Sequence, residues 1–228
     1  MIGAAHSLKS ITLFAGVSPH DRQTYERHCR WRAYHRGEQI IYRESQSRDV
    51  FFIISGTVTI ANCSLLGREV SFADLHDGDM FGELAAIDGG PRCATVMART
   101  EAQLAVMEAE TLRQAMTEHP SVASAMMKRL TGIVRASNIR IMELSTVGAH
   151  HRVCAELLRI VNTTSVANGG LRITPVPVHS DIASRVSTTR ETVARVMSDL
   201  SDRGIIRREL DSLVVRDLSQ LVSILEHE

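Results

Sequence analysis

The chain has 228 residues, a formal net charge of zero, 44% hydrophobic residues and 23% charged residues, a composition typical of a globular protein with one large or two modest domains. Before residue 81 no apolar run can span a bilayer, and residues 1–14 lack the apolar core of a signal peptide, so we expect a cytoplasmic protein with no membrane partner. The four cysteines form no Cys-x-x-Cys pair and the ten histidines are scattered, which argues against a metal site and a disulfide framework. From residue 149 onward ten arginines balance ten acidic residues, so composition alone does not support nucleic-acid binding.

The first half of the chain changes from a helical pattern to a strand pattern. Residues 8–30 predict a short helical lead-in, in which Ser18 caps a turn that begins at Pro19. From residue 36 to residue 107, short apolar or alternating runs are separated by glycines. Strands at this spacing predict a small antiparallel β-barrel or jelly roll, interrupted once by a helical turn at residues 83–87.

Residues 81–96 place a glycine, a carboxylate and an arginine around a tight bend. Gly82 has no Cβ, so its backbone can approach a ligand closely, and the N–H groups that open the following turn form an anion site. Arg92 can donate a forked pair of hydrogen bonds to a phosphate, and Glu83 can accept one from a ribose hydroxyl. The segment therefore suits both polar parts of a 3′,5′-cyclic nucleotide. The structural alternative is a plain ion pair between Glu83 and Arg92 across the bend.

A long helix is predicted for residues 121–147, with Pro120 near its first turn and Gly148 after its end. Its apolar positions alternate at spacings of four and three, which favours a parallel two-stranded coiled coil and hence a homodimer. The alternative is a helix that packs only on its own barrel. The heptad seam consists of Ala123, Met127, Leu130, Val134, Ser137, Ile141 and Leu144. Ser137 is its polar exception, and together with Asn138 it could bond the purine edge of a ligand.

The last eighty residues carry a helix-turn-helix spacing. A helix at 150–162 precedes a short helix at 179–186, a turn at Ser187 and a second helix at 188–200. One face of this second helix is apolar, and the opposite face carries two arginines and a glutamate around a small alanine, which suits a major groove. A β-wing is predicted to follow, from residue 204 to residue 215. The DNA-binding residues that we predict are Thr188, Thr189, Arg190, Glu191, Arg195, Arg207 and Arg208.

Two structural alternatives compete with groove recognition on this helix. Glu191 and Arg195 stand four residues apart and could form a surface ion pair, and Thr188 with Glu191 matches a capping box. Their position after a short helix and turn, and before a wing, favours the nucleic-acid interpretation.

The segment 81–96, the dimer helix and the winged helix-turn-helix, in this order, resemble the bacterial CRP/FNR transcription regulators, and within them the cyclic-AMP receptor protein branch. Residues 120–152 align with that branch without a gap, which implies that Ser137 and Asn138 contact the purine. The resemblance also implies a cyclic nucleotide effector, a two-fold symmetric DNA site with TGTGA-like half-sites, and RNA polymerase as a partner. The ligand-binding residues predicted on this basis are Phe81, Gly82, Glu83, Leu84, Arg92, Cys93, Ala94, Ser137 and Asn138.

Two departures from the family pattern leave the base preference open between cyclic AMP and cyclic GMP. Position 93 is a cysteine where this segment usually has Ser, Thr or Ala, and position 138 is an asparagine rather than a hydroxyl residue. A thiol is a weak donor, and an asparagine can recognise either purine.

We therefore expect an α+β protein that is not an enzyme and holds no metal. Residues 1–120 would form a cyclic-nucleotide-binding β-roll, 121–148 a dimerisation helix with a hinge at Gly148, and 149–228 a winged helix-turn-helix. The alternatives are the same fold that is constitutive or gated by another effector, and a cupin-like barrel enzyme. The enzyme would need converging metal ligands, and the predicted strands show no His-x-His or comparable set.

Overall fold

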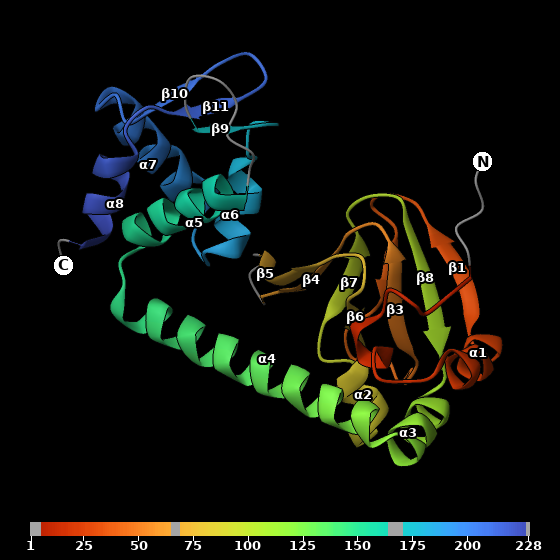
Figure 1. Cartoon of the computed structure of the whole chain (residues 1–228). Helices are drawn as coiled ribbons and strands as arrows, with labels where there is room; N and C mark the ends of the chain where they lie inside the picture. Colours follow the sequence, from red (N-terminus) through yellow and green to blue (C-terminus); the bar gives the residue numbers. More distant parts are fainter. Residues whose placement is uncertain (1–5, 65–68, 164–170, 227–228) are drawn as a thin grey trace. The chain divides into compact units, whose positions relative to one another are not determined.

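The computed structural model describes residues 6–64, 69–163 and 171–226. The chain forms two compact units, Met1–Arg135 and Ala136–Glu228 (Figure 1). The predicted α+β class, with an antiparallel β-roll, a long helix and a helix-turn-helix, is confirmed.

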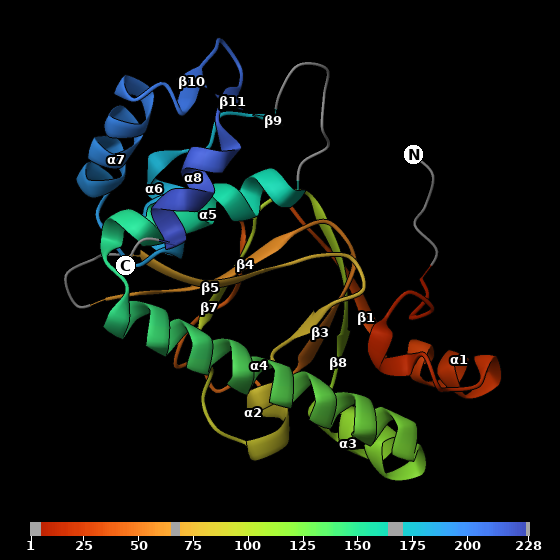
Figure 2. The ribbon, with the colours of Figure 1, turned by 60° about the vertical axis from the view of Figure 1, so that its left-hand side comes forward.

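The first unit is built on two four-stranded antiparallel sheets, with strand orders β1-β8-β3-β6 and β2-β7-β4-β5 (Figure 2). This is the predicted jelly-roll arrangement. The strands are β1 (Arg30–Tyr34), β2 (Gln39–Ile41), β3 (Val50–Ser55), β4 (Val58–Cys63), β5 (Glu69–Leu75), β6 (Met80–Phe81), β7 (Thr95–Ala98) and β8 (Ala102–Met107).

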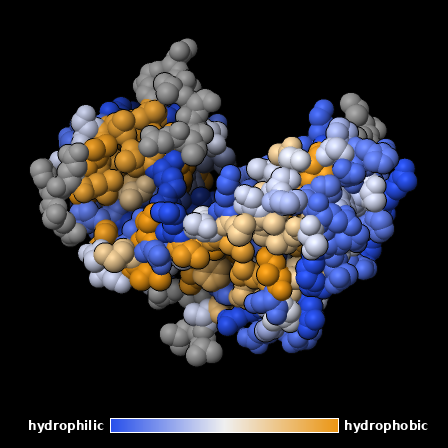
Figure 3. Space-filling model, turned by 60° about the horizontal axis from the view of Figure 1, so that its bottom comes forward, coloured by the Kyte–Doolittle hydropathy of each residue, from blue (hydrophilic) through white to orange (hydrophobic). Residues whose placement is uncertain are grey.

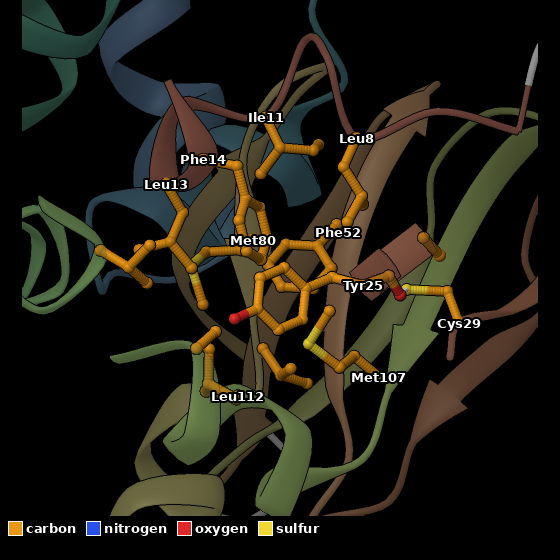
Figure 4. Packing of buried hydrophobic residues seen from close by; sticks show 14 of the residues in the cluster. Leu8, Ile11, Leu13, Phe14, Tyr25, Cys29, Phe52, Met80, Met107 and Leu112 are labelled. Atoms are coloured by element: carbon orange, nitrogen blue, oxygen red, sulfur yellow. Dashed lines mark hydrogen bonds between the residues drawn. The ribbon is translucent and has the colours of Figure 1, made fainter. Parts of the chain in front are cut away.

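Strand β3 explains why the first unit has two separate apolar cores. Successive side chains of a strand point to opposite faces. Phe51 and Ile53 join one apolar cluster, whereas Val50 and Phe52 join a second cluster that includes residues of the flanking helices (Figure 4). Because both faces of β3 are buried, its sequence is a continuous apolar run rather than an alternating one.

Three short helical elements flank the sheets: η1 (Thr12–Phe14), α1 (Pro19–Arg27) and α3 (Ala109–Glu118). The predicted cap of α1 is confirmed, because the Ser18 hydroxyl accepts a hydrogen bond from the Asp21 N–H at 3.1 Å. The predicted lead-in over residues 8–30 is wrong at its end, since Arg30 already begins β1. Helix α3 was not predicted.

Helix α4 (Pro120–Thr146) confirms the long helix within one residue at each end. Val122 and Met126 are fully buried in the cluster that contains Phe52. Farther along, α4 leaves large apolar side chains exposed, and hydrophobic colour covers the part of Figure 3 that this helix crosses. These exposed residues are Met127, Ile133, Val134, Ile139, Ile141, Met142 and Leu144.

The second unit packs helices against a small three-stranded sheet of order β10-β11-β9. Its elements are α5 (Ala149–Thr163), β9 (Leu171–Ile173), α6 (His179–Arg185), α7 (Arg190–Asp202), β10 (Ile206–Arg208), β11 (Leu213–Val215) and α8 (Leu218–Glu226). Val193, Val196, Met197 and Leu200 of α7 are buried in its core, as the helical projection predicts. Strand β9 and helix α8 were not predicted.

Candidate ligand pocket and nucleic-acid interface

Helix α2 (Glu83–Asp88) lies within residues 81–96, hereafter the cassette, and begins after a glycine with a left-handed backbone. Gly82 has φ 84°, and a Cβ there would lie 2.6 Å from the Arg92 Nη1 and 2.9 Å from the Asp49 carbonyl oxygen. Any other residue would therefore displace the arginine or strain the backbone. In the described structure, the absent Cβ makes room for Arg92 itself.

Arg92 is buried, and its side chain donates hydrogen bonds to two carbonyl oxygens and one hydroxyl oxygen. Its side chain donates from Nη1 to the Gly82 carbonyl at 2.9 Å, from Nη2 to the Asp49 carbonyl at 2.6 Å and from Nε to the Ser47 hydroxyl at 3.1 Å. Only 3% of the residue is exposed, and this burial lowers the pKa of Arg92. A guanidinium has five N–H groups, so two remain for an anion.

Glu83 is equally buried, at 5% exposure, and its partner differs from the one that the structural alternative predicts. Its Oε1 accepts a hydrogen bond from the Nε of Arg129, a residue of α4, at 3.3 Å. The described ion pairs include no direct pair between Glu83 and Arg92. The cassette therefore buries a carboxylate and a guanidinium that are fixed by separate partners, which suits a ligand with one hydroxyl part and one anionic part.

The other predicted ligand residues differ in their exposure. The Phe81 ring is buried and stacks on Phe51 at a centroid distance of 4.9 Å, and Ala94 is also buried. Leu84 and Cys93 are exposed, and the Cys93 carbonyl accepts a hydrogen bond from Asn62. Phe81 and Ala94 shape the strand ends, whereas Leu84 and Cys93 can meet a ligand with their side chains. Ser137 and Asn138 are exposed residues of α4 in the second unit.

Helix α7 presents three charged side chains to solvent. Arg190, Glu191 and Arg195 are exposed, and no ion pair joins Glu191 to Arg195 within the described part of the chain. Hydrogen bonds from its own backbone N–H and from the Thr189 hydroxyl lower the pKa of Glu191. The described ion pairs therefore do not include the Glu191–Arg195 pair that was the alternative to groove recognition.

The N-terminus of α7 is capped one residue later than the capping-box alternative requires. The Thr189 hydroxyl accepts a hydrogen bond from the Thr192 N–H at 3.2 Å, and the helix begins at Arg190. Thr188 is buried at 8% exposure. The Thr188–Glu191 capping box is therefore wrong in register, because the N-cap is Thr189.

The wing is a hairpin whose turn is fixed by a partly buried network around Ser212. Arg207 and Arg208 lie on β10 and are exposed. At the turn, Arg172 donates to the Glu209 carboxylate and to the Ser212 hydroxyl, each at 2.6 Å. The Glu209 charge is thus paired with Arg172 of β9, whereas Arg207 and Arg208 remain exposed cations of the wing.

The turn between α6 and α7 is tied to the end of α4 by two arginines. Arg140 donates to the hydroxyl of Ser187, which has a positive φ of 52°, at 3.1 Å. Arg152 donates to the Val186 carbonyl at 3.0 Å and also to the Val147 carbonyl. Neither helix α3 nor these arginine contacts were identified from the sequence.

A pocket of about 510 Å³ lies beside this linkage, within the second unit. Its arginines are engaged by protein groups: Arg185 and Arg159 pair with the buried Glu156, and Arg140 and Arg152 bond the turn. We assign this pocket a structural role.

Comparisons with known proteins agree with this geometry. Residues 31–119 match the cyclic nucleotide-binding domain family, and residues 151–224 match the Crp-like helix-turn-helix domain family. A CRP-like cAMP-activated global transcriptional regulator of Mycobacterium tuberculosis is 29% identical over 92% of this chain and 94% of its own length. The cyclic AMP receptor protein of Thermus thermophilus is 27% identical over 95% of this chain and 98% of its own length.

Solved structures share the fold. The c-di-GMP-responsive global regulator CLP of Xanthomonas campestris superimposes with a TM-score of 0.76 at 20% identity, covering 84% of this chain and 95% of that one. In the described part of the chain, no helix combines the length and apolarity that crossing a membrane requires. The two relatives are described as a transcriptional regulator and as a cyclic AMP receptor protein, in agreement with the expectation that the chain is not an enzyme. The chain therefore belongs to the CRP/FNR family of transcription regulators, with a cyclic nucleotide-binding domain followed by a DNA-binding helix-turn-helix domain.

Proposed function

We propose that this regulator is a homodimer that binds cyclic AMP or cyclic GMP in its cassette and, when loaded, binds a palindromic DNA site with TGTGA-like half-sites. One observation carries the proposal. Glu83 and Arg92 are both nearly completely buried, where a charged side chain is costly unless other groups compensate it. Their remaining hydrogen-bonding capacity matches the ribose and the cyclic phosphate of such a ligand.

The roles in the ligand site divide between shared and base-specific contacts. The two free N–H groups of Arg92 bind the cyclic phosphate, and the Glu83 carboxylate accepts from the 2′-hydroxyl, which every 3′,5′-cyclic ribonucleotide carries. Cys93, Ser137 and Asn138 distinguish the bases. The relatives described as cAMP-activated support cyclic AMP, and the c-di-GMP-responsive regulator with the same fold makes c-di-GMP a required competitor in any test.

The homodimer proposal is supported by the seam of α4. Val134, Ile141 and Leu144 stand at heptad spacing and are exposed in the single chain. An apolar seam of this kind is stabilised when a second copy covers it. Ile139 and Met142 are equally exposed but lie outside the seam, which offers an internal control.

The DNA proposal assigns the exposed face of α7 to the major groove. Arg190 and Arg195 pair with guanine O6 and N7, and Glu191 accepts from cytosine N4. Arg207 and Arg208 of the wing bind phosphates, which position the protein without reading sequence. RNA polymerase is the expected partner at the promoter.

Arg140 and Arg152 supply a route by which α4 controls α7. Because they bond the turn that precedes α7, a shift of the end of α4 moves the turn directly. Gly148 then acts as a pivot between α4 and α5. The ligand must favour the DNA-binding arrangement over the alternative, because equal affinity for both would shift nothing.

Calorimetric titration of the full chain with cyclic AMP, cyclic GMP and c-di-GMP tests the ligand proposal. We expect saturable binding of one or both mononucleotides, and loss of that binding in Arg92→Leu but not in Arg43→Leu, which removes an exposed arginine. Binding of c-di-GMP alone, or unchanged binding in folded Arg92→Leu, would overturn the proposal.

A further inference from the structure

The pocket of about 510 Å³ in the second unit is large enough for a small organic molecule. Its wall is formed by the end of α4, by α5, and by residues at the ends of α6 and α8. Ligand sites in proteins commonly measure about 300–1,000 Å³. The structural role of its arginines, which hold the turn before α7, therefore leaves room for a ligand in the same pocket.

The pocket carries more positive than negative side chains. Arginines line it at positions 140, 152, 159 and 185, whereas Glu143 supplies a carboxylate to the lining. The buried Glu156, outside the lining, pairs with both Arg159 and Arg185, so that one carboxylate serves two guanidinium groups. The four arginines thus exceed these two carboxylates by two charges.

The pKa of Arg140 indicates that the positive charges of the pocket crowd one another. Burial lowers the pKa of Arg140, and the charges of Arg159 and Arg152 act in the same direction, whereas Glu143 and Glu156 oppose them. A further cation is disfavoured where positive charges crowd, and the same positive potential favours an anion.

Two arginines on α5 keep donors after their bonds to the protein are counted. Arg152 donates from Nε to the Val186 carbonyl and from Nη1 to the Val147 carbonyl. Arg159 donates from Nη1 to the Glu156 carboxylate. A guanidinium has five N–H groups, so within the described part of the chain each of these arginines retains several donors.

The two arginines lie on one face of α5 with a small residue between them. Arg152, Ala155 and Arg159 are spaced by three and four residues, which aligns them along the helix. Ala155 also lines the pocket, and its side chain is a single methyl group. The gap between the two guanidinium groups therefore belongs to the pocket.

We propose that this pocket is a second ligand site, separate from the cassette, which binds a phosphate monoester with a compact apolar body. A phosphate monoester carries a charge of about −1.5 to −2 at pH 7, which matches the excess of the arginines. Its oxygens accept forked hydrogen bonds from Arg152 and Arg159. The apolar side chains of Val147 and Leu225 line the remainder of the pocket and contact the organic body.

A ligand in this site would act on the recognition helix from within the second unit. Arg152 bonds both the ligand and the Val186 carbonyl, and Val186 lies in the turn that precedes α7. The proposal is independent of cyclic nucleotide binding, since none of these residues belongs to the cassette.

Phenyl phosphate tests the proposal directly, because it joins a phosphate monoester to an apolar ring. The full chain is titrated calorimetrically in phosphate-free buffer with phenyl phosphate, inorganic phosphate and phenol. We expect saturable binding of phenyl phosphate, with an affinity about tenfold or more above that of inorganic phosphate, since only the ester also buries apolar surface. Absence of saturable phenyl phosphate binding would overturn the proposal.

Two variants locate the bound phosphate, and thermal unfolding verifies that each is folded. Arg159→Gln removes a side chain that is 61% exposed, and Glu156 keeps its pair with Arg185. We expect it to weaken phenyl phosphate binding by about tenfold or more, as for a lost hydrogen bond to a charged group. Ala155→Leu fills the gap between the arginines without changing the charge, and should abolish the preference for phenyl phosphate over inorganic phosphate.

Arg216→Gln is the matched control, because Arg216 is an exposed arginine of the same unit outside the pocket lining. It should bind phenyl phosphate as the wild type does. Equal weakening in Arg216→Gln and Arg159→Gln would indicate general charge attraction to the surface and would overturn the proposal. Binding that neither Arg159→Gln nor Ala155→Leu changes would place the phosphate elsewhere on the chain and would overturn it as well.

Glu143→Gln gives an effect of the opposite sign. It removes the carboxylate of the lining and raises the positive excess of the pocket, so phenyl phosphate should bind several-fold more tightly at low salt. Weaker binding in folded Glu143→Gln would contradict the electrostatic basis of the site.

Discussion

The cassette and the recognition helix α7 present their charged side chains in opposite ways. In the cassette, Glu83 and Arg92 are buried and each is fixed by neighbouring groups. On α7, Arg190 and Arg195 are exposed, and Arg195 donates a long hydrogen bond of 3.4 Å to Thr192 of its own helix. A small ligand is bound best by side chains that are already fixed and shielded from water. Side chains that bind DNA can be exposed, because the DNA surface orders them when the complex forms. Substitutions of Glu83 or Arg92 in the cassette should therefore change both folding and binding, and substitutions of the exposed arginines of α7 should change binding alone.

The largest expected effect is that of Arg92→Leu. The change removes the donors to the partly buried carbonyls of Gly82 and Asp49 and to the exposed Ser47 hydroxyl, and each of the two carbonyls left unpaired costs up to about 1–3 kcal/mol. We expect a marked fall in the midpoint of thermal unfolding together with loss of nucleotide binding. Arg195→Leu on α7 is the comparison, and it should unfold at the wild-type temperature. Equal midpoints of thermal unfolding for Arg92→Leu and Arg195→Leu would contradict the expected difference between the cassette and α7.

The seam of α4 offers the next largest effect. Ile141 and Ile139 are 60% and 61% exposed, but only Ile141 lies at a heptad position. Ile141→Glu would bury a charge in a dimer and should raise the dimer dissociation constant by roughly 100-fold or more. Analytical ultracentrifugation should show a monomer for Ile141→Glu and a dimer for Ile139→Glu. Dissociation by the Ile139 variant instead would place the interface on another face of the helix.

On α7 we expect effects that depend on the base pair. Glu191→Ala should relax discrimination at one base pair by roughly tenfold, because the acceptor for cytosine N4 is lost. Arg208→Ala, which removes a proposed phosphate contact, should weaken all sequences alike and reduce the salt dependence of binding. Competition binding to a set of single-base operator variants measures both. A uniform loss in Glu191→Ala would show that this residue does not read a base.

The smallest effect is expected at the cap of α7. Thr189→Ala removes the acceptor for the Thr192 N–H and should lower the free energy of unfolding by about 1 kcal/mol. Thr189→Ser retains the hydroxyl and should match the wild type in chemical denaturation. A large change in DNA binding by Thr189→Ser would instead indicate that the threonine methyl group contacts the DNA.

Local sequence patterns predicted the elements whose cause is local. The heptad spacing of α4 and the buried face of α7 follow from helical periodicity, and the cassette residues lie within one short segment. Strand β1 was missed because only Trp31 and Tyr34 are shielded from solvent, so its sequence lacks an apolar alternation. Strand β9 is three residues long, too short for a periodic pattern.

Local sequence patterns could not predict the arginine contacts that hold the cassette, because those arginines lie far along the chain. Arg129 stands 46 residues after Glu83, and its role depends on how α4 packs on the sheet. A signal was present in the spacing of Val122, Met126 and Arg129, which share one face of the helix. That spacing predicts which way the arginine points, but only the folded chain identifies the carboxylate that it meets. Helix α8, by contrast, could have been predicted from the sequence. Its apolar residues Leu218, Leu221 and Leu225 stand at helical spacing.

Control of DNA binding by the nucleotide is tested most directly by the affinity of the full chain for a palindromic duplex with TGTGA half-sites, measured with and without saturating cyclic AMP or cyclic GMP. We expect one of these nucleotides to strengthen DNA binding by about tenfold or more, and the duplex to strengthen nucleotide binding by the same factor. Equal DNA affinity in both conditions, with the nucleotide shown to be bound, would contradict the claim that the cassette controls the recognition helix.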